Sequence, residues 1–213
     1  PHPMTCDTTA LQGRGVSFAL AEAELIWQSI LEDTIGGELR PSYGSDQRWQ
    51  QTLDGAVLTP PSREALGRYI IPMLGLYPAR GCPYRCSFCS VIKIAGHRIR
   101  SEPVEQTLES LRRAKAADVR LIMVTSDNFN KYPDAPRLLQ SMIDERIDLP
   151  FFIQCDTQLR RQPELVELLG RAGCWQVFLG VESVDRQTLR DANKHQNCPE
   201  DYQEIVELLH AQR

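Results

Sequence analysis

Hydrophobic and polar positions follow two alternating patterns from about residue 69 onward. Short continuous apolar runs are typical of parallel strands covered on both faces, and apolar residues spaced three and four apart are typical of helices with one buried face. The runs predict strands at 74–77, 119–125, 150–155 and 175–181, and the spacing predicts helices at 103–117, 135–145, 163–171 and 199–211. Strand-then-helix units in a row predict an α/β fold with a parallel sheet, either open or curled towards a barrel.

The first part of the chain carries a weaker pattern. One helix is predicted over residues 22–31, where Leu25, Ile26, Ile30 and Leu31 share a face, and Gly36-Gly37 is a suitable terminator. Residues 40–61 are rich in Pro, Gly, Ser, Gln and Asp, which is typical of a linker. We therefore divide the chain into an irregular, partly helical segment (1–65) and an α/β core (66–213).

Composition and charge exclude several classes of protein. Hydrophobic residues make up 42% and charged residues 24%, which indicates a globular and not a disordered chain. The formal net charge of −4 argues against a surface that binds nucleic acid. No apolar run approaches the roughly 20 residues of a membrane-spanning helix, and the N-terminus lacks the pattern of a signal peptide.

The cysteines are distributed unevenly. Of the seven, Cys82, Cys86 and Cys89 fall within eight residues, while the others are scattered. A secreted disulfide framework normally has an even count and more even spacing. The pattern therefore indicates a reducing compartment, the cytoplasm, with one cysteine group kept for a metal.

That group lies in the segment Gly81-Cys82-Pro83-Tyr84-Arg85-Cys86-Ser87-Phe88-Cys89, directly after the first predicted core strand. Three thiolates at this spacing can hold a cube-shaped iron–sulfur cluster while one iron stays without a protein ligand and open to a small molecule. Two alternatives remain at this point. The cysteines can form a zinc site with a distant fourth ligand such as His97, or they can be three inert thiols.

The C-x₃-C-x₂-C spacing, with an aromatic residue before the last cysteine, resembles the signature of the radical S-adenosylmethionine (SAM) superfamily. The resemblance implies a [4Fe–4S] cluster on Cys82, Cys86 and Cys89, with SAM chelating the open iron. It also implies reductive cleavage of SAM to methionine and a 5′-deoxyadenosyl radical. Phe88 would give backbone contacts near the adenine, and Tyr84 would pack over the cluster.

If the resemblance holds, further cofactor contacts are expected where the later strands end. After the second core strand, Ser126, Asp127 and Asn128 stand in place of the family's Gly-Gly-Glu-like segment, which holds the SAM amino group. The alternative is that Asp127 or Asn128 caps the next turn. After the third strand, Gln154 is a candidate cofactor or substrate contact, while Asp156 is a candidate turn cap and Cys155 a small buried residue.

The fourth core strand ends in Gly180-Val181-Glu182-Ser183, which resembles a Gly-hydrophobic-Glu-Ser segment of many family members. A carboxylate at the end of an apolar strand needs a partner. The resemblance makes Glu182 and Ser183 candidate SAM contacts. The structural alternative for Glu182 is an ion pair with Arg160 or Arg186.

Tyr69-Ile70-Ile71-Pro72 and Ser126-Asp127-Asn128-Phe129-Asn130 resemble the branch of the family that carries an N-terminal cobalamin-binding domain. Pro1-His2-Pro3 resembles the end of the last loop of that domain. Residues 1–65 would then be a remnant of that domain with a linker, and 66–213 a radical SAM core that lacks its last βα units. No Asp-x-His-x-x-Gly segment is present, so we expect the parent protein and not this chain to hold cobalamin.

The branch often methylates unactivated carbon, which predicts a methyltransferase acting on a small-molecule or lipid-like substrate, with a flavodoxin- or ferredoxin-type electron donor. One alternative is another radical SAM reaction, such as an oxidation or a rearrangement. A second is an iron–sulfur protein that transfers electrons and never cleaves SAM. A third is a zinc-stabilised binding module.

Overall fold

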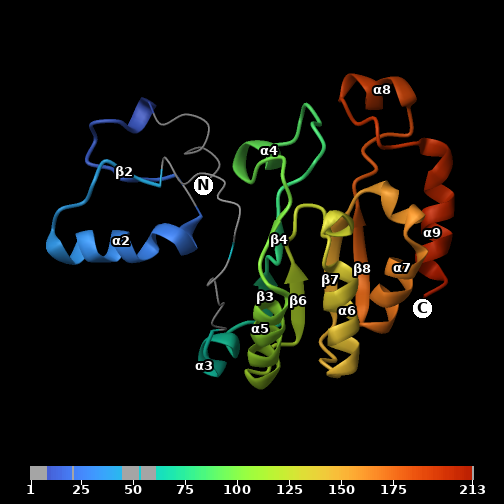
Figure 1. Cartoon of the computed structure of the whole chain (residues 1–213), viewed down its shortest axis with the longest axis horizontal. Coiled ribbons are helices and arrows are strands. Elements are labelled where there is room, and N and C mark those ends of the chain that lie inside the picture. Colours follow the sequence, from blue (N-terminus) through green and yellow to red (C-terminus); the bar gives the residue numbers. More distant parts are fainter. Residues whose placement is uncertain (1–8, 21, 45–52, 54–60, 213) are drawn as a thin grey trace.

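A computed structural model describes residues 9–20, 22–44, 53 and 61–212 (Figure 1). The linker predicted over 40–61 and the segment Pro1-His2-Pro3 fall largely or wholly outside these ranges. Within them, the α/β class and the parallel sheet are confirmed. The strands of the main sheet are β3 (Met73–Leu76), β6 (Leu121–Val124), β7 (Phe151–Cys155) and β8 (Cys174–Leu179), in the spatial order β3-β6-β7-β8, and all neighbours pair in parallel.

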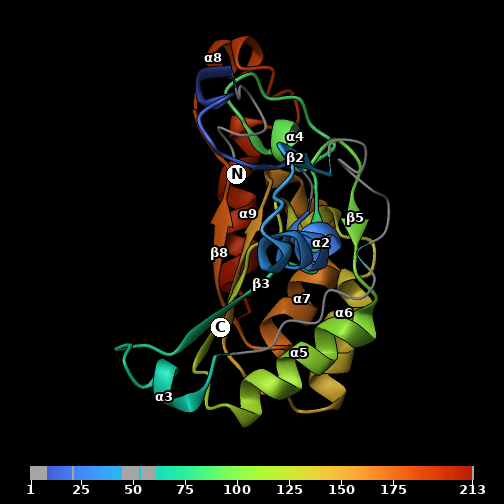
Figure 2. The ribbon, with the colours of Figure 1, turned by 90° about the vertical axis from the view of Figure 1, so that its left-hand side faces the viewer.

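Helices connect these strands and cover one face of the sheet (Figure 2). They are α5 (Val104–Ala116), α6 (Ala135–Asp144) and α7 (Pro163–Arg171), and α9 (Tyr202–His210) follows β8 further along the chain. Each buries an apolar stripe, such as Leu138, Leu139 and Met142 of α6, against alternate strand residues such as Ile122 and Ile153. This packing forms the hydrophobic core of the described chain.

The opposite face of the sheet is more open. Met73 of β3 and Phe178 of β8 are 46% and 50% exposed, whereas Leu74 beside Met73 is buried and Val177 and Leu179 beside Phe178 are partly buried. Gln154 of β7 pairs in register with Phe178 and points to this same open face. The strand alternation therefore presents Gln154 to the face of the sheet that the helices leave open.

Short helices and one short strand pair lie outside the main sheet. They are the 3₁₀ helices η2 (Phe129–Lys131), η3 (Thr157–Arg161) and η4 (Pro199–Asp201), the helices α3 (Arg63–Leu66), α4 (Val91–Ile94) and α8 (Arg186–Asp191), and the antiparallel pair β4 (Ala79–Arg80) and β5 (Arg100–Ser101). The predicted helix over 199–211 is thus a 3₁₀ turn followed by α9. In Figure 1, α4 and α8 lie at the end of the sheet where the strands terminate.

The N-terminal segment contains η1 (Thr9–Leu11), α2 (Ala23–Gly36) and a two-stranded parallel pair, β1 (Phe18–Ala19) with β2 (Ser42–Tyr43). Helix α2 ends as predicted, since Gly37 adopts φ +75° and donates to the carbonyls of Asp33 and Thr34. Of the predicted apolar face, Ile26 is buried but Leu31 is 43% exposed. No described helix has the length and apolar character required to cross a membrane.

Candidate active site

The cysteine segment follows β4 and is held at its start by backbone contacts. Gly81 adopts φ +101°, and a Cβ atom there would lie 2.2 Å from the carbonyl oxygen of Arg98. The next residue, Cys82, donates its N–H to the carbonyl of Gly96 at 3.2 Å. Glycine is therefore required for the close approach that brings the first cysteine beside the strand ends.

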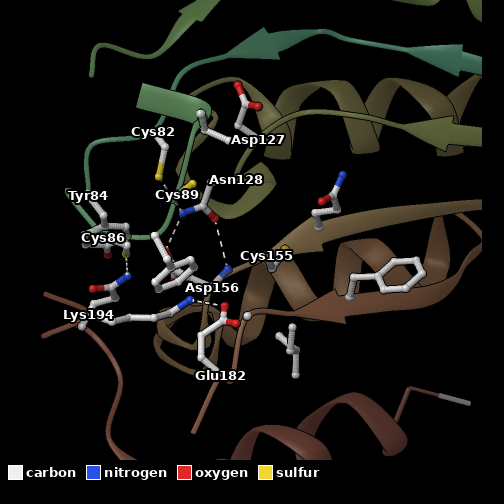
Figure 3. Close-up of a pocket in the computed structure, with 17 residues that line it drawn as sticks. Cys82, Tyr84, Cys86, Cys89, Asp127, Asn128, Cys155, Asp156, Glu182 and Lys194 are labelled. Atoms are coloured by element: carbon white, nitrogen blue, oxygen red, sulfur yellow. Dashed lines mark hydrogen bonds and ion pairs between the residues drawn. The ribbon is translucent and has the colours of Figure 1, made fainter. Parts of the chain in front are cut away.

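Cys82, Cys86 and Cys89 line one end of a cavity of about 300 Å³ at the carboxyl ends of the strands (Figure 3). This volume is at the lower end of the range for small-molecule sites. The sequence-predicted contacts that also line it are Tyr84, Phe88, Asp127, Asn128, Gln154 and Glu182. Residues far apart in the sequence, from four strand ends, thus converge on one cavity.

The remaining predicted contacts, Ser126 and Ser183, do not line this cavity. The Ser126 hydroxyl is buried and accepts the backbone N–H of Ala79 at 3.2 Å, which joins β6 to β4. The Ser183 hydroxyl accepts the N–H of Asp185 at 3.0 Å in the turn before α8. Both hydroxyls support the backbone of the site, and their role as SAM contacts stays a prediction.

The donor set fits a cluster better than a zinc ion. Zinc needs donors about 2.0–2.3 Å from one point, and within the described ranges no group of three or more His, Cys, Asp or Glu side chains could hold a metal ion. Each thiolate of a cube-shaped cluster binds a different iron, so its ligands stand further apart. His97, the candidate fourth zinc ligand, is exposed and does not line the cavity.

Asp127 anchors the cysteine segment to the end of β6. Its Oδ2 accepts the N–H of Gly81 at 2.7 Å and the hydroxyl of Tyr77 at 2.5 Å. Burial raises the pKa of this carboxyl above its ordinary value, against the effect of these hydrogen bonds and of Arg100 and Arg80. Asp127 therefore holds the cysteine segment through these hydrogen bonds, and it also lines the cavity. It does not cap the following turn.

Asn128 and Asp156 join the ends of β6 and β7. Asn128 Nδ2 donates to Asp156 Oδ2 at 2.7 Å, and Asn128 Oδ1 accepts the N–H of Asp156 at 3.1 Å. Asp156 is 5% exposed and accepts the N–H of Gln158 at 2.7 Å, which is the predicted turn cap at the start of η3. Burial and the nearby Asp156 carboxylate raise the pKa of the Tyr84 hydroxyl, and the Tyr84 ring lies against Lys131, whose Nζ is 5.6 Å from the ring centroid.

Glu182 pairs with a residue that the sequence did not single out. Its Oε1 lies 2.6 Å from Nζ of Lys194, whose side chain is only 8% exposed and lines the cavity (Figure 3). The proposed arginine partners are wrong, because Arg160 pairs with Asp201 and Arg186 pairs with Glu200. Lys194 was missed because it lies in the loop after α8, which carries no strand-end signal.

Lys194 is also close to Phe88. Its Nζ lies 5.7 Å from the centroid of the Phe88 ring, which is within the range of a cation–π contact. A Cβ atom at Gly180 would lie 2.8 Å from the same nitrogen, so the absence of a side chain there leaves room for the ammonium group. The cavity therefore carries one buried cation between an aromatic ring and a carboxylate.

The cysteine thiols differ in their surroundings. Burial raises the pKa of Cys82, while a backbone N–H and the Asn128 amide oppose that rise. Burial raises the pKa of Cys155 far above its ordinary value and that of Cys174 to about 12. Without a metal these last two stay protonated, in keeping with the role of small apolar residues.

Comparison with known proteins agrees with this site. Residues 76–213 match the Radical SAM superfamily, which is more than half of the chain. Bacteriochlorophyllide d C-12(1)-methyltransferase of Chlorobaculum tepidum is 25% identical over 220 residues, which cover 98% of this chain and 46% of that protein. Bacteriochlorophyllide d C-8(2)-methyltransferase of the same organism is 27% identical over 206 residues, covering 89% and 45%.

The fold also matches a solved structure, the radical SAM methyltransferase TsrM of Kitasatospora setae with cobalamin and a [4Fe–4S] cluster bound. The TM-score is 0.59 at 21% identity, and the match covers 66% of this chain and 29% of that one. The chain spans less than half the length of the curated relatives described above. It is a member of the radical SAM superfamily, related to the cobalamin-dependent methyltransferases of that superfamily.

Proposed function

We propose that this chain holds a [4Fe–4S] cluster on Cys82, Cys86 and Cys89 and binds SAM in the adjoining cavity. The observation that carries the proposal is the position of the three thiols of one short segment at one end of a cavity. The other cysteine among the described residues that line it, Cys155, belongs to β7 and is buried, and no described histidine lines it. When bound, the cluster supplies one electron that cleaves SAM to methionine and a 5′-deoxyadenosyl radical. A closed electron-transfer cluster would need a fourth ligand.

The residues around the cavity have complementary roles in this proposal. SAM carries an ammonium and a carboxylate group, and Glu182 and Lys194 supply the opposite charges within one ion pair. Gln154 offers its side-chain amide from the end of β7, and Asn128 offers the second lone pair of its Oδ1 from the end of β6. Phe88 is 57% exposed, so its ring and backbone are accessible to the adenine. Together these groups orient SAM and exclude water from the cavity.

For the parent protein we propose cobalamin-dependent methylation of a carbon atom in a small-molecule or lipid-like substrate. The similarity to curated methyltransferases supports this reading. Residues 1–65 would be the end of a cobalamin-binding domain and a linker, and the core would begin at residue 66. Cobalamin would be held outside this chain, and a flavodoxin- or ferredoxin-type protein would supply the electron.

The experiment that tests the proposal compares two cysteine variants after anaerobic reconstitution with iron and sulfide. Cys86→Ala should lose the cluster absorbance and all formation of 5′-deoxyadenosine from SAM and dithionite. Cys198→Ser is the matched control, because Cys198 contacts Arg186 and Glu200 outside the cavity. A Cys86→Ala chain that still assembles a full cluster would contradict the ligand assignment.

Product analysis on the parent protein separates methylation from other radical reactions. Cobalamin-dependent methylation should yield S-adenosylhomocysteine beside 5′-deoxyadenosine, because one SAM donates the methyl group and another is cleaved. An oxidation or rearrangement would yield 5′-deoxyadenosine or recovered SAM without S-adenosylhomocysteine. That second result would contradict the methyltransferase proposal while leaving the radical SAM chemistry intact.

A further inference from the structure

Two side-chain amides contact the sulfur atoms of the proposed cluster ligands. Asn128 Nδ2 lies 3.8 Å from Sγ of Cys82, and Gln196 Nε2 lies 3.7 Å from Sγ of Cys86. These distances suit N–H···S contacts, because sulfur is larger than oxygen. The amides come from separate parts of the chain, one from the end of β6 and one from the loop after α8.

The orientation of the Asn128 amide is fixed by Asp156. Asn128 Oδ1 accepts the backbone N–H of Asp156 at 3.1 Å, and Nδ2 gives one hydrogen to Asp156 Oδ2 at 2.7 Å. An amide nitrogen carries two hydrogens and accepts none, so the second hydrogen is available to Cys82. Asp156 is buried and held by η3, and the amide is therefore positioned by the protein alone.

Gln196 is positioned by a separate set of contacts between the loop after α8 and the cysteine segment. Ser87 donates its N–H to the carbonyl of Ala192 at 3.0 Å, and Asn193 Nδ2 donates to the carbonyl of Arg85 at 2.6 Å. The carbonyl of Gln196 itself accepts the side-chain amide of Gln158. A metal-bound thiolate offers only lone pairs, so the Gln196 side chain must present its N–H₂ group to Cys86.

Hydrogen bonds to the ligating sulfurs are one determinant of the reduction potential of an iron–sulfur cluster. The reduced cluster carries one more negative charge than the oxidised one, and a donor stabilises the more negative state more strongly. We infer that Asn128 and Gln196 are positioning residues that raise the reduction potential of the cluster through Cys82 and Cys86. This inference rests on the proposed function, and it assigns to both amides a role in the one-electron reduction.

The test is a redox titration of the anaerobically reconstituted chain, with dithionite as the reductant, viologen mediators and no SAM, followed by electron paramagnetic resonance. Gln196→Met keeps the length of the side chain and removes the donor. We expect the ratio of reduced to oxidised cluster at a fixed potential to fall on the order of tenfold. For a one-electron couple this is a shift of about 59 mV to more negative potential.

Two further variants make the result specific. Gln187→Met is the matched control, since Gln187 is exposed on α8 and donates to Asp191 at 2.7 Å away from the cysteines. It should leave the potential unchanged. Gln196→Glu keeps the size of the side chain but replaces the donor with a negative charge, so it should shift the potential further in the same direction. Asn128→Leu should also shift it that way.

The outcomes separate the inference from the function on which it rests. A wild-type chain that assembles no cluster would overturn the proposed function and the inference with it. A cluster whose potential is the same in wild type, Gln196→Met and Gln196→Glu would overturn the inference alone. Loss of the cluster in both Gln196 variants, but not in Gln187→Met, would make Gln196 an assembly residue and would also overturn the tuning role.

Discussion

At the scale of single residues, Lys194 carries the buried positive charge of the cavity. Its ammonium group pairs with Glu182 at 2.6 Å and lies beside the Phe88 ring. Lys194→Met should weaken SAM binding about tenfold or more, because a charge-assisted hydrogen bond contributes roughly 1.5–3 kcal/mol and Glu182 loses its partner. Equilibrium dialysis with SAM on the reconstituted chain measures the change.

The matched control for this prediction is Lys115→Met. Lys115 lies on α5, is 49% exposed and does not line the cavity. The Lys115→Met chain should bind SAM as tightly as the wild type does. Equal SAM affinity in Lys194→Met and Lys115→Met would show that the buried cation takes no part in binding.

Asp127 gives a pH-dependent prediction. Its pKa is raised in the folded chain because of burial, so the folded state favours the protonated carboxyl. The stability that this provides is full below the unfolded value of about 3.9 and is lost as the pH rises through the folded pKa. Asp127→Asn stays neutral throughout. The free energy of unfolding of the wild type relative to Asp127→Asn should therefore fall as the pH rises from about 4.

Urea unfolding of both chains across this pH range measures the difference. Asp118→Asn, at an exposed position between α5 and β6, is the control for the loss of a carboxylate. A wild-type chain that gains stability over Asp127→Asn as the pH rises would contradict the assignment. It would mean that the hydrogen bonds from Tyr77 and Gly81 outweigh burial.

The candidate site was predicted from the sequence only where local signals exist. The cysteine spacing identified Cys82, Cys86 and Cys89, and the strand ends identified Asn128, Gln154 and Glu182, all of which line the cavity. Lys194 and Gln196 could not be identified in this way. Gln196 contacts a cysteine 110 residues away, and no periodic pattern or spacing reports a contact of that kind.

At the scale of elements, the junction between β4 and the cysteine segment depends on Gly81. Gly81→Ala should destabilise the chain by about 2–4 kcal/mol, because it combines φ +101° with a Cβ atom 2.2 Å from a backbone oxygen. Cluster content after reconstitution should fall in parallel. Thermal and urea unfolding and iron analysis measure both effects.

Gly75→Ala is the control for that substitution. Gly75 lies in β3, and a Cβ atom there would meet no other atom within 4 Å. We expect it to be neutral or slightly stabilising. If Gly81→Ala behaved in the same way, the tight approach between the cysteine segment and Arg98 would be absent from the folded protein.

The Glu22 carboxylate joins the N-terminal segment to the core. Glu22 lies 2.5 Å from both Arg80 of β4 and Arg100 of β5, and both arginines are largely buried. Glu22→Gln should cost roughly 3 kcal/mol, because it leaves two buried cations without this counter-charge. Limited proteolysis should then cut the segment before α3 faster than in the wild type.

Glu32→Gln is the matched control for this prediction. Glu32 lies on α2 and forms an exposed contact with Gln28. Glu32→Gln should leave the rate of proteolysis unchanged. Equal cleavage of Glu22→Gln and Glu32→Gln would show that the ion pairs do not hold the segment to the core.

The strands of the main sheet and the helices that connect them were predicted well, and the short elements outside the main sheet were not. The helix predicted over 163–171 coincides with α7, and the other core strands and helices begin within a few residues of their predicted positions, because each has a clear apolar period. The pair β4–β5 consists of two-residue strands, and α8 buries only Leu189. Such elements are stabilised by tertiary contacts, so a periodic pattern cannot reveal them.

At the scale of the whole molecule, four parallel strands and the loops at their carboxyl ends build the cavity. The three cysteines, the Asn128–Asp156 pair and the Glu182–Lys194 pair come from different strand ends and close on the same space. In our proposal this cavity binds a cluster with one open iron and a charged small molecule beside it.

The measurement that tests this claim most directly is electron paramagnetic resonance of the anaerobically reconstituted, dithionite-reduced chain, recorded with and without SAM. The account predicts the signal of a reduced [4Fe–4S] cluster whose shape changes when SAM is added, because SAM binds the open iron. A cluster signal that is indifferent to saturating SAM would contradict the open iron site. A chain that assembles no cluster and retains zinc would contradict the whole assignment.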